Sequence, residues 1–196
     1  MKELLVATKN QGKFREIFEV LDGFKLIFAG DLDIDDSLLI EDAETFSGNA
    51  FKKAKFYFDE TGLLTLAEDS GIWVKALIDE LGVKTRRWGA GEHATDEEWV
   101  AYFLERMAGE KERGAEFVCC ACLLGEGIEK FFEGQTKGVI TENLEAPILK
   151  GLPLSSCFLP EGMEKVYAAL STEEKNQISH RGKAIKKVQE FLDTIA

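Results

Sequence analysis

The feature that most restricts the fold is a pair of long strand-like segments in the second half of the chain. Residues 115–125 read AEFVCCACLLG and residues 128–140 read IEKFFEGQTKGVI, with Gly-Glu-Gly where they meet. A short glycine-containing connection of this kind joins antiparallel strands, because parallel strands need a much longer crossover. We therefore predict two antiparallel strands here, around which the remaining elements must be arranged.

Helices and strands alternate in the remainder of the chain. Apolar residues at helical spacing predict helices, with Thr45 and Gly62 at the ends of one and a capping box of Thr95 and Glu98 at the start of another. The predicted helical ranges are 12–21, 45–62, 94–109, 163–170 and 171–195, the last with a break near Ser179. The further predicted strands are 3–8, 24–29 and 63–77, and a loop rich in proline and glycine is predicted over 146–162.

This order of elements predicts an α/β protein with an elongated central mixed sheet flanked by helices. A chain of 196 residues, of which 45% are apolar, is long enough for one large domain or two small lobes. We expect a single domain, residues 1–196, in which two lobes enclose a cleft.

The charge and hydropathy of the chain exclude several classes of partner. Its formal net charge of −12 argues against the basic surface that sequence-independent nucleic-acid binding requires, although a small phosphorylated ligand needs only a few local cations. There is no run of 18 apolar residues, and the start, MKELLVATKNQGK, lacks the apolar segment of a signal peptide. We therefore expect a cytoplasmic protein that binds neither nucleic acid nor membranes.

Three of the four cysteines, Cys119, Cys120 and Cys122, lie in one predicted strand. Neighbouring strand positions face opposite sides, so these thiols cannot converge on a metal ion, and their spacing is not that of a CxxC motif. We expect buried, small, apolar side chains.

The sequence Glu68-Asp69-Ser70-Gly71 interrupts an otherwise apolar strand. Two adjacent carboxylates are costly to bury without partners. Carboxylates followed by Ser-Gly at the end of a core strand supply the hard oxygen ligands that Mg²⁺ prefers beside a phosphate, and one of them could orient or deprotonate a water molecule. Because strand neighbours alternate, only one of the two acids should dominate the site. The alternative is a turn with solvated acids.

Two further stretches predict contacts with phosphate. In ATKNQGK, Thr8, Asn10 and Lys13 lie where a strand passes into a helix start, which offers backbone N–H groups to an anion. In the following long helix, Asn49 and Lys53 share one face. The alternatives are an ordinary strand–turn–helix connection and a lysine that extends from a core helix to solvent.

A third polar stretch lies near the C-terminus. Lys175, His180 and Arg181 provide hydrogen-bond donors for a base edge or a phosphate. His180 has the chemistry of a catalytic base, but no serine or cysteine nucleophile motif accompanies it. The alternative is a corner between two helices with polar groups at the surface.

The order of these stretches resembles that of the inosine triphosphate pyrophosphatase family. ATKNQGKxxEI, TFxxNAxxKA, EDSG, an aromatic residue after two arginines, FxGxxxGxI and EKNxxSHRGKA follow one another over nearly the whole chain. The resemblance implies an elongated α/β homodimer with a cleft, and Mg²⁺-dependent hydrolysis of ITP, dITP and XTP to the monophosphate and pyrophosphate, which cleans the nucleotide pool. Donors aimed at the 6-oxo group would favour hypoxanthine and xanthine over adenine.

The resemblance also implies roles for individual residues. Asp69 would be the general base and would bind Mg²⁺ together with Glu41 and Glu68. The residues that the resemblance assigns to substrate binding are Thr8, Asn10, Lys13, Lys53, Ser70, Arg87, Lys175, His180 and Arg181.

The chain departs from the family pattern at the end that would hold the base. Residues 149–162 read LKGLPLSSCFLPEG, where the family carries a GFGYDP segment before its Phe-x-Pro. Phe158 and Pro160 fit, but the Phe, Tyr and Asp of that segment are absent. Two alternatives therefore stay open, namely a related pyrophosphatase with another base preference and a nucleotide-binding protein without turnover.

Overall fold

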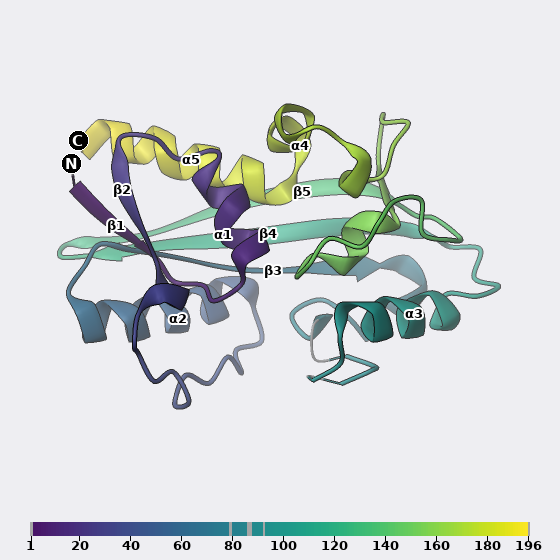
Figure 1. Cartoon of the computed structure of the whole chain (residues 1–196), viewed down its shortest axis with the longest axis horizontal. Coiled ribbons are helices and arrows are strands. Elements are labelled where there is room, and N and C mark those ends of the chain that lie inside the picture. Colours follow the sequence, from purple (N-terminus) through teal and green to yellow (C-terminus); the bar gives the residue numbers. More distant parts are fainter. Residues whose placement is uncertain (1, 79, 86–87, 92, 196) are drawn as a thin grey trace.

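The structure is a computed structural model that describes residues 2–78, 80–85, 88–91 and 93–195. The helices longer than one turn are α1 (Gln11–Phe18), α2 (Phe46–Thr61), α3 (Asp96–Arg106), α4 (Thr172–Ile178) and α5 (His180–Ile195). The strands are β1 (Lys2–Val6), β2 (Phe24–Phe28), β3 (Thr65–Val74), β4 (Gly114–Gly125), β5 (Ile128–Ile140) and β6 (Phe158–Pro160). Figure 1 shows an elongated molecule in which the long strands β3, β4 and β5 run between helices.

The strands form one mixed sheet in the order β2-β1-β3-β4-β5-β6. β1 pairs in parallel with β2 and β3, whereas the neighbours from β3 to β6 are antiparallel. The predicted antiparallel pair is confirmed, because β4 and β5 pair from Gly125 opposite Ile128 to Gly114 opposite Val139. β3 lies between β1 and β4, and this places the two adjacent acids in the middle of the sheet.

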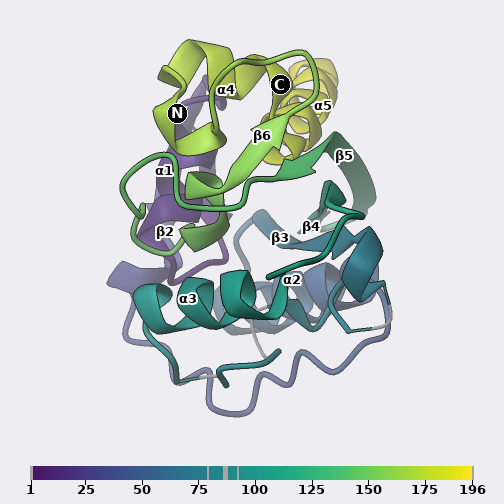
Figure 2. The same cartoon turned by 90° about the vertical axis from the view of Figure 1, so that its right-hand side faces the viewer.

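Helices cover both faces of this sheet, as Figures 1 and 2 show. α5 packs against β4 and β5 and contacts α1, and their shared core includes Ile17 and Val188. α2 packs against the opposite face of β3 and β4, where Tyr57 is buried. α3 lies toward the other end of the long strands and packs around Phe103 and Phe158. Within the described ranges, no helix has the length and apolar character that crossing a membrane requires.

The cysteines of β4 are buried and free, as predicted. Cys119 faces the core beneath α5, while Cys120 and Cys122 face the side of α2. Burial raises the pKa of Cys120 and of Cys122 to about 12, so both thiols are protonated at neutral pH. Their role is to fill the space between the sheet and its helices.

The predicted helix ends are confirmed. The Thr45 side chain caps α2 at its start, and Gly62 ends α2 in the left-handed conformation, with φ of 67°. Thr95 and Glu98 form the predicted capping box of α3. Ser179 is extended, with φ of −66° and ψ of 146°, and it separates α4 from α5.

The helix predicted over 163–170 is wrong. Only Tyr167–Ala169 forms a single 3₁₀ turn there. Val166 and Tyr167 are adjacent in sequence and both are buried, so this segment inserts two consecutive side chains into the core. A two-turn helix at the surface gains too little from its own hydrogen bonds to compete with that burial.

Gly134 in β5 allows α5 to lie directly on the sheet. A Cβ atom at this position would lie 2.0 Å from the carbonyl oxygen of His180 and 2.7 Å from the backbone nitrogen of Ala184. Both contacts are with backbone atoms of α5, so a side chain at position 134 could be accommodated only if the helix moved.

We expect Gly134→Ala to lower the free energy of unfolding by more than about 3 kcal/mol, because it displaces the start of α5. Urea unfolding measures the change. Gly114→Ala is the matched control, since its Cβ would meet only the flexible side chain of Lys75, at 3.1 Å. Equal, small losses in the two variants would contradict the close packing of α5.

Candidate active site

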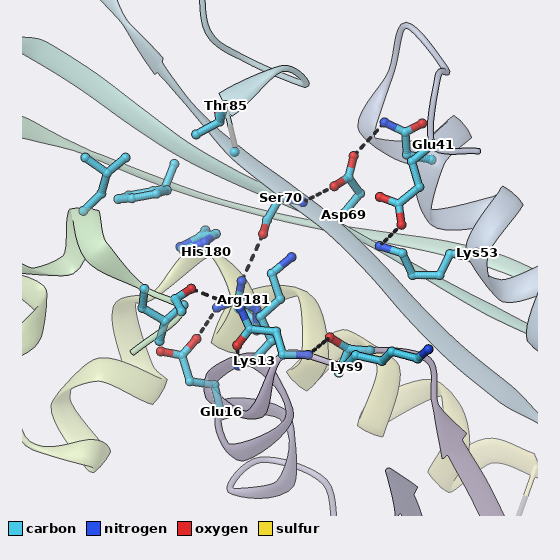
Figure 3. A pocket seen from close by; sticks show the side chains of 18 of the residues that line it. Lys9, Lys13, Glu16, Glu41, Lys53, Asp69, Ser70, Thr85, His180 and Arg181 are labelled. Atoms are coloured by element: carbon cyan, nitrogen blue, oxygen red, sulfur yellow. Dashed lines mark hydrogen bonds and ion pairs between the residues drawn. The ribbon is translucent and has the colours of Figure 1, made fainter. Parts of the chain in front are cut away.

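A cavity of about 600 Å³ lies beside the middle of β3, between α1, α2, α3 and the start of α5. Figure 3 shows Glu41, Lys53 and Asp69 together on one side of this cavity and His180 on the other. Ten of the twelve residues predicted for the site line it: Thr8, Asn10, Lys13, Glu41, Lys53, Asp69, Ser70, Lys175, His180 and Arg181. Glu68 is buried behind the wall, and Arg87 lies outside the described residues.

The turn between β1 and α1 is held by its own polar side chains. Asn10 caps α1, because its Oδ1 accepts from the backbone N–H of Lys13 at 3.1 Å. The Asn10 backbone N–H donates to Thr8 Oγ1, and the Asn10 side-chain amide donates to the carbonyl oxygen of Gly151. Thr8 and Asn10 therefore shape this wall, and Asn10 ties it to the loop of residues 149–152.

Glu68 is the centre of a buried charge cluster. Its Oε1 lies 2.7 Å from Lys13 Nζ, its Oε2 lies 3.6 Å from Arg181 Nη2, and the thiol of Cys119 donates to Oε2. Burial alone would raise the pKa of Glu68, but the charges of Lys13, Arg181 and Lys53 outweigh it and hold the pKa far below the usual glutamate range. Glu68 is therefore ionised, and its carboxylate is occupied by protein cations.

Asp69 points to the other face of β3, as strand alternation predicts. Its Oδ2 accepts from Asn49 Nδ2 at 3.0 Å, and its Oδ1 accepts from the backbone N–H of Ser70. Asn49 is fixed in turn because its own Oδ1 accepts from the backbone N–H of Ala43. Burial raises the pKa of Asp69, and the nearby charges of Lys13 and Lys53 offset this only in part.

Lys53 lies between the acids of the cavity. Its Nζ is 2.8 Å from Glu41 Oε1 and donates to the backbone carbonyl of Glu68 at 3.3 Å. Burial would lower the pKa of Lys53, but the charges of Glu41, Asp69 and Glu68 raise it, so the amine stays protonated. Lys53, which was predicted to contact phosphate, thus pairs with Glu41 in this structure.

Glu16 was missed by the sequence analysis, although it lies three residues after Lys13 on the same face of α1. Its carboxylate pairs with both Lys175 and Arg181. Arg181 also donates to Ser70 Oγ at 3.0 Å, so Glu16 fixes two of the predicted substrate-binding cations at once. Burial opposes ionisation of Glu16, but Arg181 and Lys175 lower its pKa and keep it charged.

His180 is buried in a stack of rings. Its ring lies 4.7 Å from that of Phe117 and 6.1 Å from that of Tyr167, with interplanar angles of 14° and 13°. Burial, reinforced by the charge of Arg181, holds the pKa of His180 well below its usual range. The imidazole is therefore neutral at pH 7 and offers a flat, polarisable surface rather than a charge.

The segment that replaces GFGYDP forms the wall opposite β3. Leu152, Pro153, Leu154 and Ser155 line the cavity, and a 3₁₀ turn spans Pro153–Ser156. Gly151 is held by Asn10 on one side and donates its N–H to Asp96 on the other. This wall is therefore aliphatic with one hydroxyl, and it is anchored to α1 and to α3.

The comparisons with known proteins identify the family of the chain. A model of the Ham1 family matches residues 4–191. The chain belongs to the Ham1 family. A dITP/XTP pyrophosphatase from Bacillus licheniformis is 39% identical over an alignment of 197 positions, and the match covers 98% of this chain and 99% of that protein. A dITP/XTP pyrophosphatase from Aquifex aeolicus is 36% identical, and the match covers 97% of this chain and 96% of that protein.

A solved Ham1 structure supports the fold as well. The Ham1 protein of Staphylococcus aureus superposes with a TM-score of 0.82 at 31% sequence identity, and the match covers 100% of each chain. The predicted family resemblance and the α/β fold class are confirmed. The Ham1 family match reaches from β1 into α5, so the cavity is built entirely within it.

Among the described residues, no three acidic, histidine or cysteine side chains cluster as a ready-made metal site. The predicted metal ligands therefore divide into two kinds. Glu41 and Asp69 line the same cavity as Lys53, whereas Glu68 is turned away toward Lys13 of α1 and Arg181 of α5. Two cavity-facing carboxylates match what Mg²⁺ uses when water and substrate phosphates complete its coordination.

We expect Glu68→Gln to lower the free energy of unfolding by about 3–5 kcal/mol, because it leaves Lys13 and Arg181 buried with less compensation. Chemical unfolding at pH 7 measures this loss. Glu3→Gln is the matched control; it opens the exposed pair with Lys25 and should cost less than about 1 kcal/mol.

The pH dependence of the free energy of unfolding provides a second test with the same variant. The folded-state pKa of Glu68 is lower than the unfolded value, so its stabilisation is full at neutral pH and is lost as the pH falls below about 4–5. Glu68→Gln should therefore lose stability less steeply than the wild type on acidification. If the free energy of unfolding fell equally steeply with decreasing pH in both proteins, the result would contradict the buried ion cluster.

Proposed function

We propose that this chain hydrolyses non-standard purine nucleoside triphosphates, with dITP, XTP and ITP as substrates, to the monophosphate and pyrophosphate. Membership of the Ham1 family supports this, as does the similarity to the dITP/XTP pyrophosphatases of Bacillus licheniformis and Aquifex aeolicus. The observation that carries the proposal is the position of Asp69. It is a buried carboxylate on the wall of a large cavity, with its pKa raised and with lysines around it.

Asp69 is suited to the role of general base. Asn49 and the Ser70 N–H fix the orientation of its carboxylate, so a water molecule in the cavity would be met by an oxygen of defined direction. Correct placement of that water and neutralisation of phosphate charge account for most of the acceleration in such reactions.

We propose that Mg²⁺ is bound by Glu41 and Asp69. The fit rests on the environment of Asp69, whose negative charge is only partly compensated by Lys13 and Lys53 and would be stabilised further by a divalent cation. When bound, Mg²⁺ would neutralise phosphate charge. Lys53, which pairs with Glu41 at the cavity wall, would supply a further positive charge for a phosphate.

The opposite side of the cavity is proposed to hold the base. His180, stacked on Phe117 and Tyr167, offers a flat surface, and Glu16 holds Lys175 and Arg181 as donors beside it. Donors at this place would pair with the 6-oxo group of hypoxanthine or xanthine, whereas the amino group of adenine would leave them unsatisfied.

We further propose that the protein acts as a homodimer in the cytoplasm. The homodimer is what the family resemblance implies. The cytoplasmic location agrees with a chain that has no run of 18 apolar residues.

The catalytic assignment predicts that Asp69→Asn reduces kcat with dITP by at least about 100-fold, since it removes the base. Steady-state pyrophosphate release measures the rate, and circular dichroism checks the fold. Asp59→Asn, at an exposed position of α2 where Asp59 pairs with Lys55, is the control and should leave kcat unchanged. A near-normal rate for Asp69→Asn would show that another group activates the water.

A panel of triphosphates tests the substrate class. With Mg²⁺, we expect kcat/KM for XTP, dITP and ITP to exceed that for ATP by at least about 100-fold, the discrimination that a hydrogen-bonding base site allows. EDTA should abolish pyrophosphate release. Preference for another base would follow from the aliphatic wall of residues 152–155 and would preserve the mechanism. Nucleotide binding without any turnover would instead indicate a sensor or regulatory protein.

A further inference from the structure

Every cation that lines the cavity already has a carboxylate partner. Among the described residues these cations are Lys9, Lys13, Lys53, Lys175 and Arg181. A triphosphate brings several negative charges into this self-paired site. It must compete with these carboxylates for the cations, and it gains most where an existing pair opens or where a metal ion takes over the carboxylate.

The ion pairs differ in how readily they open. Glu68, which holds Lys13, is 1% exposed, and Glu16, which holds Arg181, is 12% exposed. Breaking a buried pair leaves an uncompensated charge in the interior. Lys9 and Asp36, by contrast, are 46% and 31% exposed, with 2.7 Å between Nζ and Oδ1. A pair so open to solvent adds little stability and is easily exchanged for another anion.

Asp36 keeps a partner when Lys9 leaves. Its Oδ2 accepts from the hydroxyl of Tyr57 at 3.1 Å, and Tyr57 is buried in the core beneath α2. The carboxylate would therefore remain hydrogen-bonded in place at the cavity wall. When Lys9 leaves, Asp36 loses one contact and keeps its hydrogen bond from Tyr57.

Lys9 is also placed where a phosphate would enter. It follows Thr8 and precedes the cap residue of α1, and it is among the side chains that line the cavity in Figure 3. It lines, in addition, a second cavity of about 820 Å³, which shares Asn10 and Gly151 with the first. A lysine that lines both cavities can reach an anion in either.

We propose that Lys9 is a further phosphate-binding residue, which exchanges Asp36 for the triphosphate of the substrate. This inference rests on the proposed function. Asp36 then acts as a competitor that masks Lys9 in the free protein, and the affinity for the triphosphate reflects the difference between the two pairings. Lys9 has no part in activating water, so its contribution belongs to KM and not to kcat.

Two substitutions should change KM in opposite directions. Lys9→Met removes the charge and should raise KM for dITP about five- to tenfold, with kcat within about twofold of the wild type. Asp36→Asn removes the competitor, while Tyr57 can still donate to the amide oxygen, and should lower KM about two- to threefold. Lys9→Arg keeps the charge and should restore KM to near the wild-type value.

The matched control is Lys25→Met. Lys25 forms an exposed pair with Glu3 at 2.9 Å on the β1–β2 edge, and it lines neither cavity. It should leave KM unchanged. A rise in ionic strength should raise KM for the wild type more steeply than for Lys9→Met, because one phosphate contact has been removed.

The outcomes separate the inference from the function on which it rests. An increase of KM in both Lys9→Met and Asp36→Asn would show that the ion pair only holds residues 31–42 in place, and this result would overturn the proposal. An unchanged KM in Lys9→Met would overturn it as well. Absence of wild-type turnover would count against the proposed function instead. Calorimetric titration with inorganic tripolyphosphate then decides, since Lys9→Met should bind it about fivefold more weakly, and equal binding would refute the phosphate contact.

Discussion

The buried carboxylate of Glu68 joins three parts of the chain that are far apart in sequence. It comes from the middle of β3, and its oxygens contact Lys13 of α1 and Arg181 of α5. Arg181 extends the cluster to Glu16 and Ser70. A shift of either helix would leave a buried charge without compensation, which is far costlier than the loss of an apolar contact. The cluster therefore fixes the starts of both helices against β3, and these starts form much of the cavity wall.

Strand alternation gives the two adjacent acids different environments. Glu68 faces cations that lower its pKa, while Asp69 faces Asn49 and the cavity, where burial raises its pKa. Both side chains end in a carboxyl group, so in water their pKa values would be nearly equal. One is committed to holding the structure together, and the other lines the cavity where substrate would lie. The opposite pKa shifts are the electrostatic signature of that division.

The sequence predicted what depends on local chemistry. The helix caps, the break at Ser179, the antiparallel pair and the opposite directions of Glu68 and Asp69 all follow from spacing and residue type, and the structure agrees. What depends on contacts between distant segments was not predictable. The pairing of Glu16 with Lys175 and Arg181 links α1 to the C-terminal helices, and no local pattern encodes it. The 3₁₀ turn at Tyr167 likewise depends on burial in a core formed by other elements.

The net charge of −12 and a site for a polyanion are compatible because the cavity cations are paired in advance. In the part of the chain that the structure describes, each lysine or arginine that lines it is held by a carboxylate, which reduces the field that reaches solvent. Binding then depends on exchange of partners, and a ligand must present enough charge to replace a carboxylate at several places at once. A triphosphate with Mg²⁺ meets that demand, whereas a monophosphate cannot replace more than one or two pairings. In the proposed reaction, the same pairing that admits the substrate would therefore favour release of the monophosphate.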